Sequence, residues 1–206
     1  MIEEEMIDLT QNRAMLRTLY APPAGEFRLV DVPKLPFAVL EGKGPPEQAA
    51  ITSAVKILYT AIYSIRREAR ERMGKSFVEA PLEILYWTDD LSELATTPRE
   101  KWHWRVQITL PLWADAKRLE RSVTEMRNKL DGTPAPYFQT IAEGKCAQFL
   151  HVGETDDLPE ILQRFYAEYL AAEELEPAGP YHEIYLDDWS RVASGKRKIL
   201  LRQPVR

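Results

Sequence analysis

A short acidic signature occurs twice in this chain and constrains its fold more than any other feature. It spans residues 81–90 and returns at residues 181–188. Each copy places a glutamate, Glu83 or Glu183, inside an apolar and aromatic run and ends on paired aspartates. Because burying a carboxylate is costly, a strand that carries one there usually has a use for it. The recurrence predicts a duplicated structural module.

The repetition extends upstream of both glutamates. Residues 30–44 align with residues 139–153 without a gap, and both segments have the pattern strand, tight turn, strand, glycine. A helical segment follows in each half, then the glutamate strand, then a last strand at residues 101–110 or 197–202. The pattern predicts an α+β fold of duplicated strand-helix-strand-strand modules related by a pseudo-twofold axis. The first two strands of each half are expected to form a hairpin.

The chain is expected to consist of a short extension and one duplicated domain that begins at residue 27 and runs to the end of the sequence. Residues 1–26 are predicted as an N-terminal helical extension. The halves of the domain cover about residues 27–112 and 137–206, and a helix at about residues 115–130 connects them.

Apolar residues at helical spacing predict three further helices. They run over residues 7–19, from about Pro45 to Gly74, and from Asp156 to about Leu170. The helices of the domain are expected to cover one face of the sheet. The other face is then left for a partner sheet or a ligand.

Charge and composition exclude several classes of function. A net charge of −5 and a predicted pI of 5.4 argue against non-specific nucleic-acid binding, which needs a basic surface. No apolar run approaches the roughly 18 residues of a membrane helix, and the acidic start does not resemble a secretory signal. Cys146 is the only cysteine, so no intrachain disulfide can form. These features predict a cytoplasmic protein without a nucleic-acid or membrane partner.

The sequence also lacks the usual motifs of metal and cofactor sites. His103, His151 and His182 have no close metal-ligand spacing. Residues 42–44 do not complete a phosphate-cradling glycine pattern. No metal and no cofactor are therefore expected.

Strand alternation identifies the side chains that accompany Glu183. Glu183 shares one face of its strand with Tyr181 and Tyr185. A carboxylate among aromatic rings attracts flat cations or polarised heteroaromatic ligands. Its pKa is raised when it is desolvated, toward the range that is useful in acid–base catalysis.

The first half offers a matching set. Glu83 shares a face with Trp87, and Trp102 shares a face with Trp104 on the following strand. If the repeat is symmetric, both glutamates and these aromatic residues converge on one groove between the halves. The alternatives are that the glutamates face solvent and that the tryptophans are ordinary core residues, which are the commoner fates of these residue types.

The order and spacing of these elements resemble the gyrase-inhibitor-like (GyrI-like) small-molecule-binding domain, which is also the effector-binding half of multidrug-sensing transcription activators. The closer resemblance is to stand-alone bacterial members, some of which hydrolyse cyclopropane-containing DNA-alkylating natural products. It covers about residues 25–206, and the segments that carry it are Leu29–Pro33, Pro81–Trp87, Trp102–Trp104, Cys146–Gly153, His182–Leu186 and Leu201–Val205.

The resemblance implies a ligand groove between the halves, with Glu183 at its floor and aromatic side chains along its walls. Arg202 has no arginine counterpart in the aligned strand of the first half, so no catalytic role is assigned to it.

The resemblance implies a hydrophobic aromatic small molecule as the ligand and hydrolysis of a cyclopropane-containing xenobiotic as the reaction. Glu183 would act as general base on a water molecule, and Tyr185 or Tyr181 would polarise the substrate carbonyl. Two other functions stay open, namely a non-catalytic drug-binding or sequestering protein and a protein that interacts with DNA gyrase. A transcription activator is not expected, because no segment outside the repeat is long enough for a helix-turn-helix domain.

Overall fold

The structure is a computed structural model, and its strands form one antiparallel sheet. It describes residues 6–45, 49–77, 80–90, 94, 97–130, 134–188 and 190–206. Within these residues the sheet has eight strands in the order β1-β6-β8-β7-β3-β4-β2-β5. The strands are β1 (Phe27–Val32), β2 (Leu35–Lys43), β3 (Leu82–Trp87), β4 (His103–Thr109), β5 (Tyr137–Ile141), β6 (Gly144–Val152), β7 (Tyr181–Tyr185) and β8 (Lys198–Pro204).

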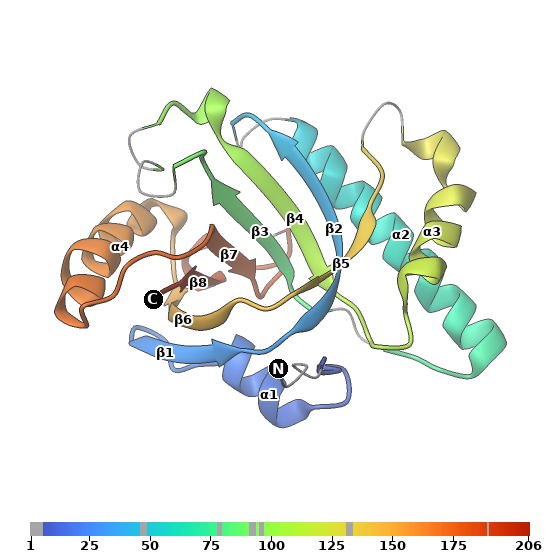
Figure 1. Cartoon of the computed structure of the whole chain (residues 1–206), viewed down its shortest axis with the longest axis horizontal. Helices are drawn as coiled ribbons and strands as arrows, with labels where there is room; N and C mark the ends of the chain where they lie inside the picture. Colours follow the sequence, from blue (N-terminus) through green and yellow to red (C-terminus); the bar gives the residue numbers. More distant parts are fainter. Residues whose placement is uncertain are drawn as a thin grey trace.

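The strand order confirms the predicted pseudo-twofold duplication. If β1, β2, β3 and β4 trade places with β5, β6, β7 and β8, the strand order is the same read from the opposite edge of the sheet. The axis therefore lies between the central strands β3 and β7, which pair with each other (Figure 1).

The predicted hairpins are wrong. β1 pairs with β6 and β2 pairs with β5, so the first two strands of each half separate and reach into the other half. Alternation of apolar and polar residues is the same whether a strand pairs within its own half or across the axis, so the sequence does not distinguish the two arrangements. The exchange interlocks the halves through backbone hydrogen bonds.

Four α-helices are described along the chain: α1 (Arg13–Tyr20), α2 (Ala49–Met73), α3 (Ala116–Glu125) and α4 (Leu158–Arg164). α4 continues into a π-helical segment at Phe165–Leu170. Short 3₁₀ turns lie at Arg99–Lys101, Arg127–Lys129, Thr155–Asp157 and Ser194–Lys196. The connecting helix expected at about residues 115–130 is therefore α3 with a 3₁₀ turn after it.

The first helix begins six residues later than predicted, at Arg13 instead of residue 7. Asp8 Oδ1 accepts a hydrogen bond from the backbone N–H of Thr10 at 2.9 Å, which closes a local turn in place of a helix. Asn12 is the helix cap, and its Oδ1 accepts from the N–H of Met15 at 3.0 Å.

The helices of the domain pack on one face of the sheet, as predicted, and the helix of the N-terminal extension packs on the other. α2 and α4 pack on one face, here called the helical face, whereas α1 packs on the opposite face, here called the α1 face. Within the helical face, α2 and α4 flank the central strands β3 and β7, one on each side, and α1 lies beside β1 (Figure 1). The face that was expected to stay open for a ligand is therefore covered by α1.

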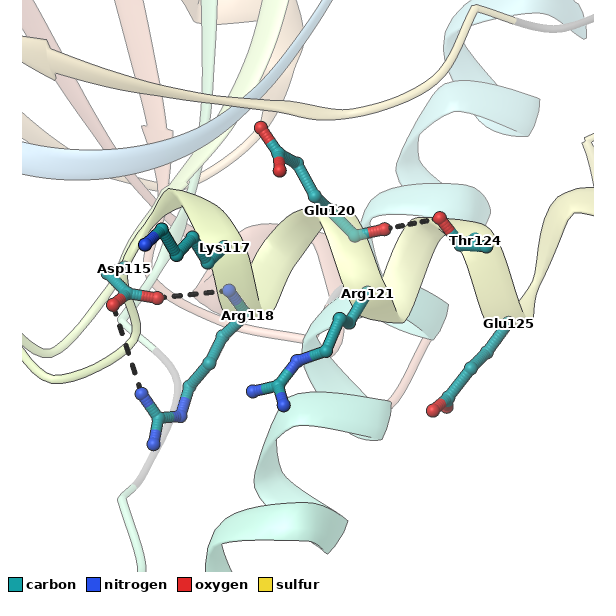
Figure 2. Close-up of a pocket in the computed structure, with 7 residues that line it drawn as sticks. All are labelled: Asp115, Lys117, Arg118, Glu120, Arg121, Thr124 and Glu125. Carbon is teal, nitrogen blue, oxygen red and sulfur yellow. Dashed lines mark hydrogen bonds and ion pairs between the residues drawn. The ribbon is translucent and has the colours of Figure 1, made fainter.

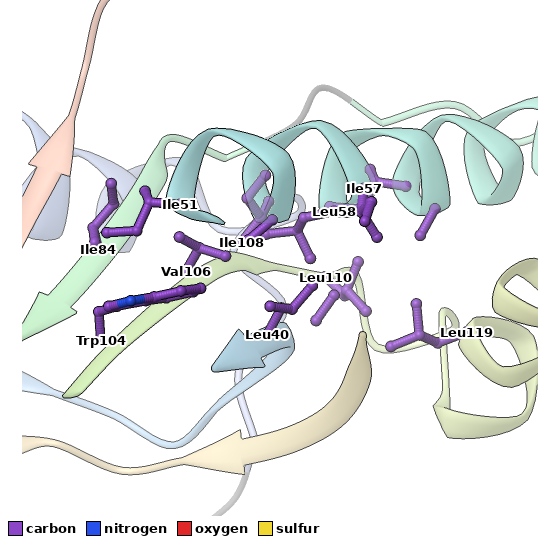
Figure 3. Close-up of a cluster of buried hydrophobic side chains, with 14 of the residues drawn as sticks. Leu40, Ile51, Ile57, Leu58, Ile84, Trp104, Val106, Ile108, Leu110 and Leu119 are labelled. Atoms are coloured by element: carbon purple, nitrogen blue, oxygen red, sulfur yellow. The ribbon is translucent and has the colours of Figure 1, made fainter. Parts of the chain in front are cut away.

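The main hydrophobic core fills the space between α2 and the strands of the first half. In Figure 3, Ile51 and Leu58 of α2 point toward Val106 and Ile108 of β4, and all four are buried. Burying an aliphatic side chain of this size contributes about 1.5–3 kcal/mol relative to leaving it exposed. This packing fixes α2 above β2 and β4.

Gly42 allows Trp104 to enter this core. The two residues pair across β2 and β4, and a Cβ atom on Gly42 would overlap Cζ2 of Trp104. We expect Gly42→Ala to lower the free energy of unfolding by about 1–3 kcal/mol, the usual cost of overpacking a core. Chemical denaturation measures this, and in a Trp104→Phe background the penalty should shrink. An equal penalty in both backgrounds would contradict the assigned overlap.

Among the helices of the described residues, none has the length and apolar character needed to cross a membrane.

Candidate ligand-binding and catalytic site

The sheet register shows which residues are related by the pseudo-twofold axis. β2 and β6 pair with β4 and β8 in the same way, so β4 and β8 can be superposed residue by residue. The pair Glu83–Gln107 then corresponds to the pair His182–Arg202. The structural counterpart of Glu83 is therefore His182, one residue away from the glutamate that the sequence alignment matched to it.

The prediction that both glutamates converge on one groove is wrong for the same reason. A twofold axis that exchanges two antiparallel strands is perpendicular to the sheet and keeps each residue on its own face. Glu183 lies opposite its own counterpart, Ile84, and both side chains point to the helical face. Glu83 is one position along β3, so its side chain points to the α1 face.

A cavity of about 560 Å³ lies on the helical face, between α4 and the ends of β3, β7 and β8. We call it the aromatic cavity. None of the described residues that line it is charged, and its aromatic members are Tyr86, Trp87, Trp102, Tyr166 and Tyr181. Such a volume and lining are typical of small-molecule sites.

The rings of the aromatic cavity form a connected wall. The Tyr86 ring lies 6.2 Å from the Tyr181 ring in a stacked arrangement and 5.9 Å from the Trp102 ring, centroid to centroid. The indole N–H of Trp102 donates to the backbone oxygen of Thr97 at 3.0 Å, which fixes the orientation of that ring. Stacking surfaces of this kind suit a flat, apolar ligand.

Glu183 lies beside the aromatic cavity, and two tyrosines hold its carboxylate. Tyr181 donates to Oε1 at 3.0 Å and Tyr185 donates to Oε2 at 2.7 Å. Glu183 is half-buried in the centre of the helical face. The carboxylate is therefore oriented on both oxygens and still accessible.

The surroundings of Glu183 make its carboxylate easier to protonate than that of a solvated glutamate. Burial raises the pKa of Glu183 above its usual value, although hydrogen bonds from Tyr185 and Tyr181 partly offset the effect. Burial, reinforced by the charge of Glu183, also raises the pKa of Tyr181 and of Tyr185. Both tyrosines therefore stay neutral hydrogen-bond donors at ordinary pH.

The structure places the predicted site residues in different environments. Trp87, Trp102 and Tyr181 line the aromatic cavity, and Tyr185 lies on the other side of Glu183. Trp104 is on the helical face but is buried in the core under α2, and it is not among the residues that line the cavity.

Most of the residues that line the cavity were not predicted from the sequence, among them Tyr86, Tyr166 and Gln203. Tyr86 is the counterpart of Tyr185, and the correct register of β3 would have identified it. Tyr166 lines the cavity from the π-helical segment, and its hydroxyl donates to Oε1 of Gln203 at 2.7 Å. π-Helical turns occur frequently at functional sites. Gln203 also lines the cavity, and no sequence pattern indicated it.

Behind the site, the α1 face holds a buried ionic cluster of Glu83, His182, Glu143 and Arg202. His182 Nε2 lies 3.2 Å from Glu83 Oε2, and His182 Nδ1 lies 3.2 Å from Glu143 Oε1. Arg202 Nη1 lies 3.4 Å from Glu143 Oε2. The two glutamates lie beside His182 and Arg202 in a region where each of these four side chains is at most 7% exposed.

The ionic cluster also anchors the N-terminal helix. Tyr20 donates its hydroxyl hydrogen to Glu83, and Arg202 Nη2 donates to the backbone oxygen of Leu19 at 2.6 Å. Gln107 Nε2 donates to Glu83 Oε2 at 2.7 Å. Glu83, which was predicted as a ligand-binding residue, therefore joins α1 to the sheet.

The protonation states of the cluster follow from its contacts. Burial alone would lower the pKa of His182, but Glu143 and Glu83 outweigh it and raise the pKa to about 9. Burial would raise the pKa of Glu143, but His182 and Arg202 lower it to about 2. His182 and Glu143 are therefore both charged at neutral pH.

This network predicts how stability depends on pH. The folded-state pKa of His182 lies above its ordinary value of 6.5, so its contribution to stability is complete below pH 6.5 and is lost as pH rises through about 9. We expect the free energy of unfolding to fall between these values, and the fall to be smaller in His182→Gln. Urea denaturation across this range measures both. If the variant shows the same pH dependence as the wild-type protein, groups other than His182 cause the fall in the free energy of unfolding.

A second depression, of about 630 Å³, runs along α3 and has the character of an ordinary surface. Figure 2 shows that its lining comes from this one helix, and acidic and basic side chains alternate along it. Asp115 caps the helix by accepting from the N–H of Arg118 at 3.0 Å. The charges neutralise one another, so this surface offers no distinct ligand chemistry.

In the part of the chain that the structure describes, no group of three or more histidine, cysteine, aspartate or glutamate side chains is arranged to hold a metal ion.

Comparison with known proteins agrees with this geometry. Residues 25–206 match the GyrI-like small molecule binding domain. The chain belongs to this family. The match covers all eight strands of the sheet, the aromatic cavity and Glu183. Among curated proteins, none matches the sequence significantly.

Solved structures of similar fold include two from Listeria innocua. An uncharacterized conserved protein from this organism is 26% identical, with a TM-score of 0.80, over 92% of this chain and 96% of that chain. A hydrolase from Listeria innocua is 25% identical, with a TM-score of 0.78, over 97% of this chain and all of that chain. The C-terminal domain of EcmrR shares the fold. It is 11% identical, with a TM-score of 0.56, over 88% of this chain and 97% of that chain.

Proposed function

We propose that this protein binds a flat, apolar small molecule in the aromatic cavity and adds water to it, with a cyclopropane-containing xenobiotic as the substrate. The observation that carries the proposal is a half-buried carboxylate, held by two tyrosine hydroxyls, beside a cavity with an uncharged aromatic lining. The similarity to a Listeria innocua hydrolase over the whole of that chain supports it.

The proposed reaction begins with Glu183 as general base. Its carboxylate takes a proton from a water molecule while the water oxygen forms a bond to a ring carbon of the cyclopropane. The ring C–C bond breaks, and its electron pair moves into a conjugated carbonyl, whose oxygen becomes anionic and then takes the proton from Glu183. Atoms and charge balance, and the product is the substrate plus one water.

The tyrosines have separate roles in this proposal. Tyr185 keeps Glu183 oriented. Tyr181 lines the aromatic cavity, so a rotation of its hydroxyl from Glu183 to the substrate would allow it to hydrogen-bond the carbonyl oxygen as negative charge develops there. A raised pKa makes Glu183 a better proton acceptor than a solvated glutamate.

The test is incubation of the protein with a cyclopropane-bearing alkylating compound, followed by mass spectrometry. A product heavier by one water, formed in molar excess over the protein, is the expected result. An analogue whose cyclopropane is not conjugated to a carbonyl is the control and should stay intact. Stoichiometric retention of unchanged compound would overturn catalysis and leave a binding protein.

A sequestering protein without catalysis is the second candidate. It is favoured by one observation, since both oxygens of Glu183 already accept hydrogen bonds from tyrosines. In that case Glu183 contributes only to binding, and the mass of the ligand does not change.

A further inference from the structure

Glu183 has a second cavity on its other side. This cavity has a volume of about 580 Å³ and is lined by Tyr59, Ala80, Pro81, Leu82, Tyr185, Leu186, Asp187 and Asp188. We call it the acidic cavity. It lies on the helical face like the aromatic cavity, but on the side of α2, which contributes Tyr59.

The two cavities are counterparts under the pseudo-twofold axis. Tyr86 of the aromatic cavity corresponds to Tyr185 of the acidic cavity, and Tyr181 of the aromatic cavity corresponds to Leu82 of the acidic one. The duplication therefore produced two half-sites, each lined by residues of both halves of the domain. The axis passes through the Ile84–Glu183 pair between them.

The half-sites meet at Glu183. Tyr181, from the wall of the aromatic cavity, and Tyr185, from the wall of the acidic cavity, donate to the two oxygens of the same carboxylate. A ligand that is longer than the aromatic cavity would pass over this carboxylate into the acidic cavity.

The two half-sites differ in charge. The described lining of the aromatic cavity contains no charged residue. The acidic cavity is lined by Asp187 and Asp188, and none of the described residues around it is basic. Asp188 already forms an ion pair with Arg191 at 3.1 Å and accepts from Ser190.

Asp187 is the carboxylate that remains for a ligand. Its Oδ2 accepts from the backbone N–H of Lys198 at 2.9 Å, and in the described part of the chain no basic side chain pairs with it. The residue is half-buried, so a cation beside it would be partly shielded from solvent.

We propose that the acidic cavity is a second ligand subsite, which takes the protonated-amine end of an elongated ligand whose flat apolar part fills the aromatic cavity. This inference rests on the proposed function and specifies its ligand class. Asp187 would accept a charge-assisted hydrogen bond from the amine, while Tyr59 and Leu82 would pack against the linker.

The test uses three flat aromatic compounds that share one ring system. One has no tail, one carries a short alkylammonium tail, and one carries a hydroxyl tail of equal length. Fluorescence titration of the wild-type protein is expected to show about tenfold tighter binding of the amine than of the hydroxyl compound. One charge-assisted hydrogen bond contributes an affinity difference of about this size.

Asp187→Asn should abolish this preference and leave the affinity for the tail-less compound unchanged. The asparagine oxygen can still accept from Lys198, and unchanged tail-less binding shows that the variant is folded. Asp31→Asn, which removes the same charge from an exposed position on β1, is the matched control and should keep the preference.

The outcomes separate the two proposals. An equal preference for the amine in wild type and Asp187→Asn would overturn the acidic subsite, while binding of the tail-less compound would still support the aromatic cavity. Failure of the tail-less compound to bind the wild-type protein would overturn both.

Discussion

Replacing Glu143 with alanine is expected to lower the free energy of unfolding by about 3–5 kcal/mol, because it leaves buried cations without their counter-charge. Glu143 contacts both His182, at 3.2 Å, and Arg202, at 3.4 Å, and all three side chains are closed to solvent. Chemical denaturation near pH 6 measures the effect where His182 is fully charged. Equilibrium unfolding energies of domains are about 5–15 kcal/mol, so this is a large fraction of the total.

An exposed ion pair provides the matched control. Glu176 lies 3.3 Å from Arg206, but both side chains are more than two-thirds exposed. Glu176→Ala should therefore cost less than about 1 kcal/mol, as solvent-exposed pairs usually do. A loss for Glu143→Ala no larger than for this control would show that the ionic cluster does not hold the α1 face together.

Replacing Glu183 with glutamine is expected to lower the turnover of a cyclopropane substrate by roughly 10²-fold or more, the usual scale of a lost general base. The amide keeps the size of the side chain and can still accept one tyrosine hydrogen bond. Binding of a neutral flat ligand should therefore change little. Glu160→Gln, an exposed substitution on α4, is the control and should leave turnover unchanged.

The same variant should not lose stability at neutral pH. The folded-state pKa of Glu183 is raised, so the charged carboxylate disfavours folding above its ordinary pKa of 4.5, and glutamine removes that cost. We expect the free energy of unfolding at pH 7 to rise, as at many functional sites. Unchanged turnover would remove Glu183 from the mechanism, and lost turnover with lost stability would point to misfolding.

Activity of the wild-type protein should also fall as the pH is lowered through the raised pKa of Glu183. A protonated carboxyl group cannot take a proton from water. The acidic limb of the pH–rate profile should therefore lie above pH 4.5, the ordinary value for glutamate, and steady-state rates against pH measure it.

The duplication and the α+β class could be predicted from the sequence because both depend on periodicity and on the order of elements. The alignment of residues 30–44 with residues 139–153 matches the superposition of β2 on β6. The pairing of β1 with β6 could not be predicted, because a strand has the same alternation whichever partner it finds.

The candidate site was predicted in part, and the errors have one source. Matching Glu83 to Glu183 by residue type shifted β3 by one position relative to the true symmetry. In a strand, a shift of one residue moves every side chain to the other face. Glu83 was therefore placed in the groove, and Tyr86, which lines the cavity, was overlooked.

The ionic cluster behind the site was beyond sequence reasoning. Its members come from β3, β7, β8 and the turn before β6, and α1 closes over them. No local pattern marks such a set, because its members are brought together only by the pairing of distant strands. Arg202 illustrates this, since its counterpart under the pseudo-twofold axis is Gln107, a neutral residue in the same cluster of contacts.

The most direct test of the proposed site is a crystal structure of Glu183→Gln with an intact cyclopropane-bearing substrate bound. We expect electron density for the ligand on the helical face, stacked among Tyr86, Trp102 and Tyr181, with the cyclopropane next to the side chain at position 183. Ligand density on the α1 face, along α3, or anywhere that leaves the aromatic cavity empty would contradict it.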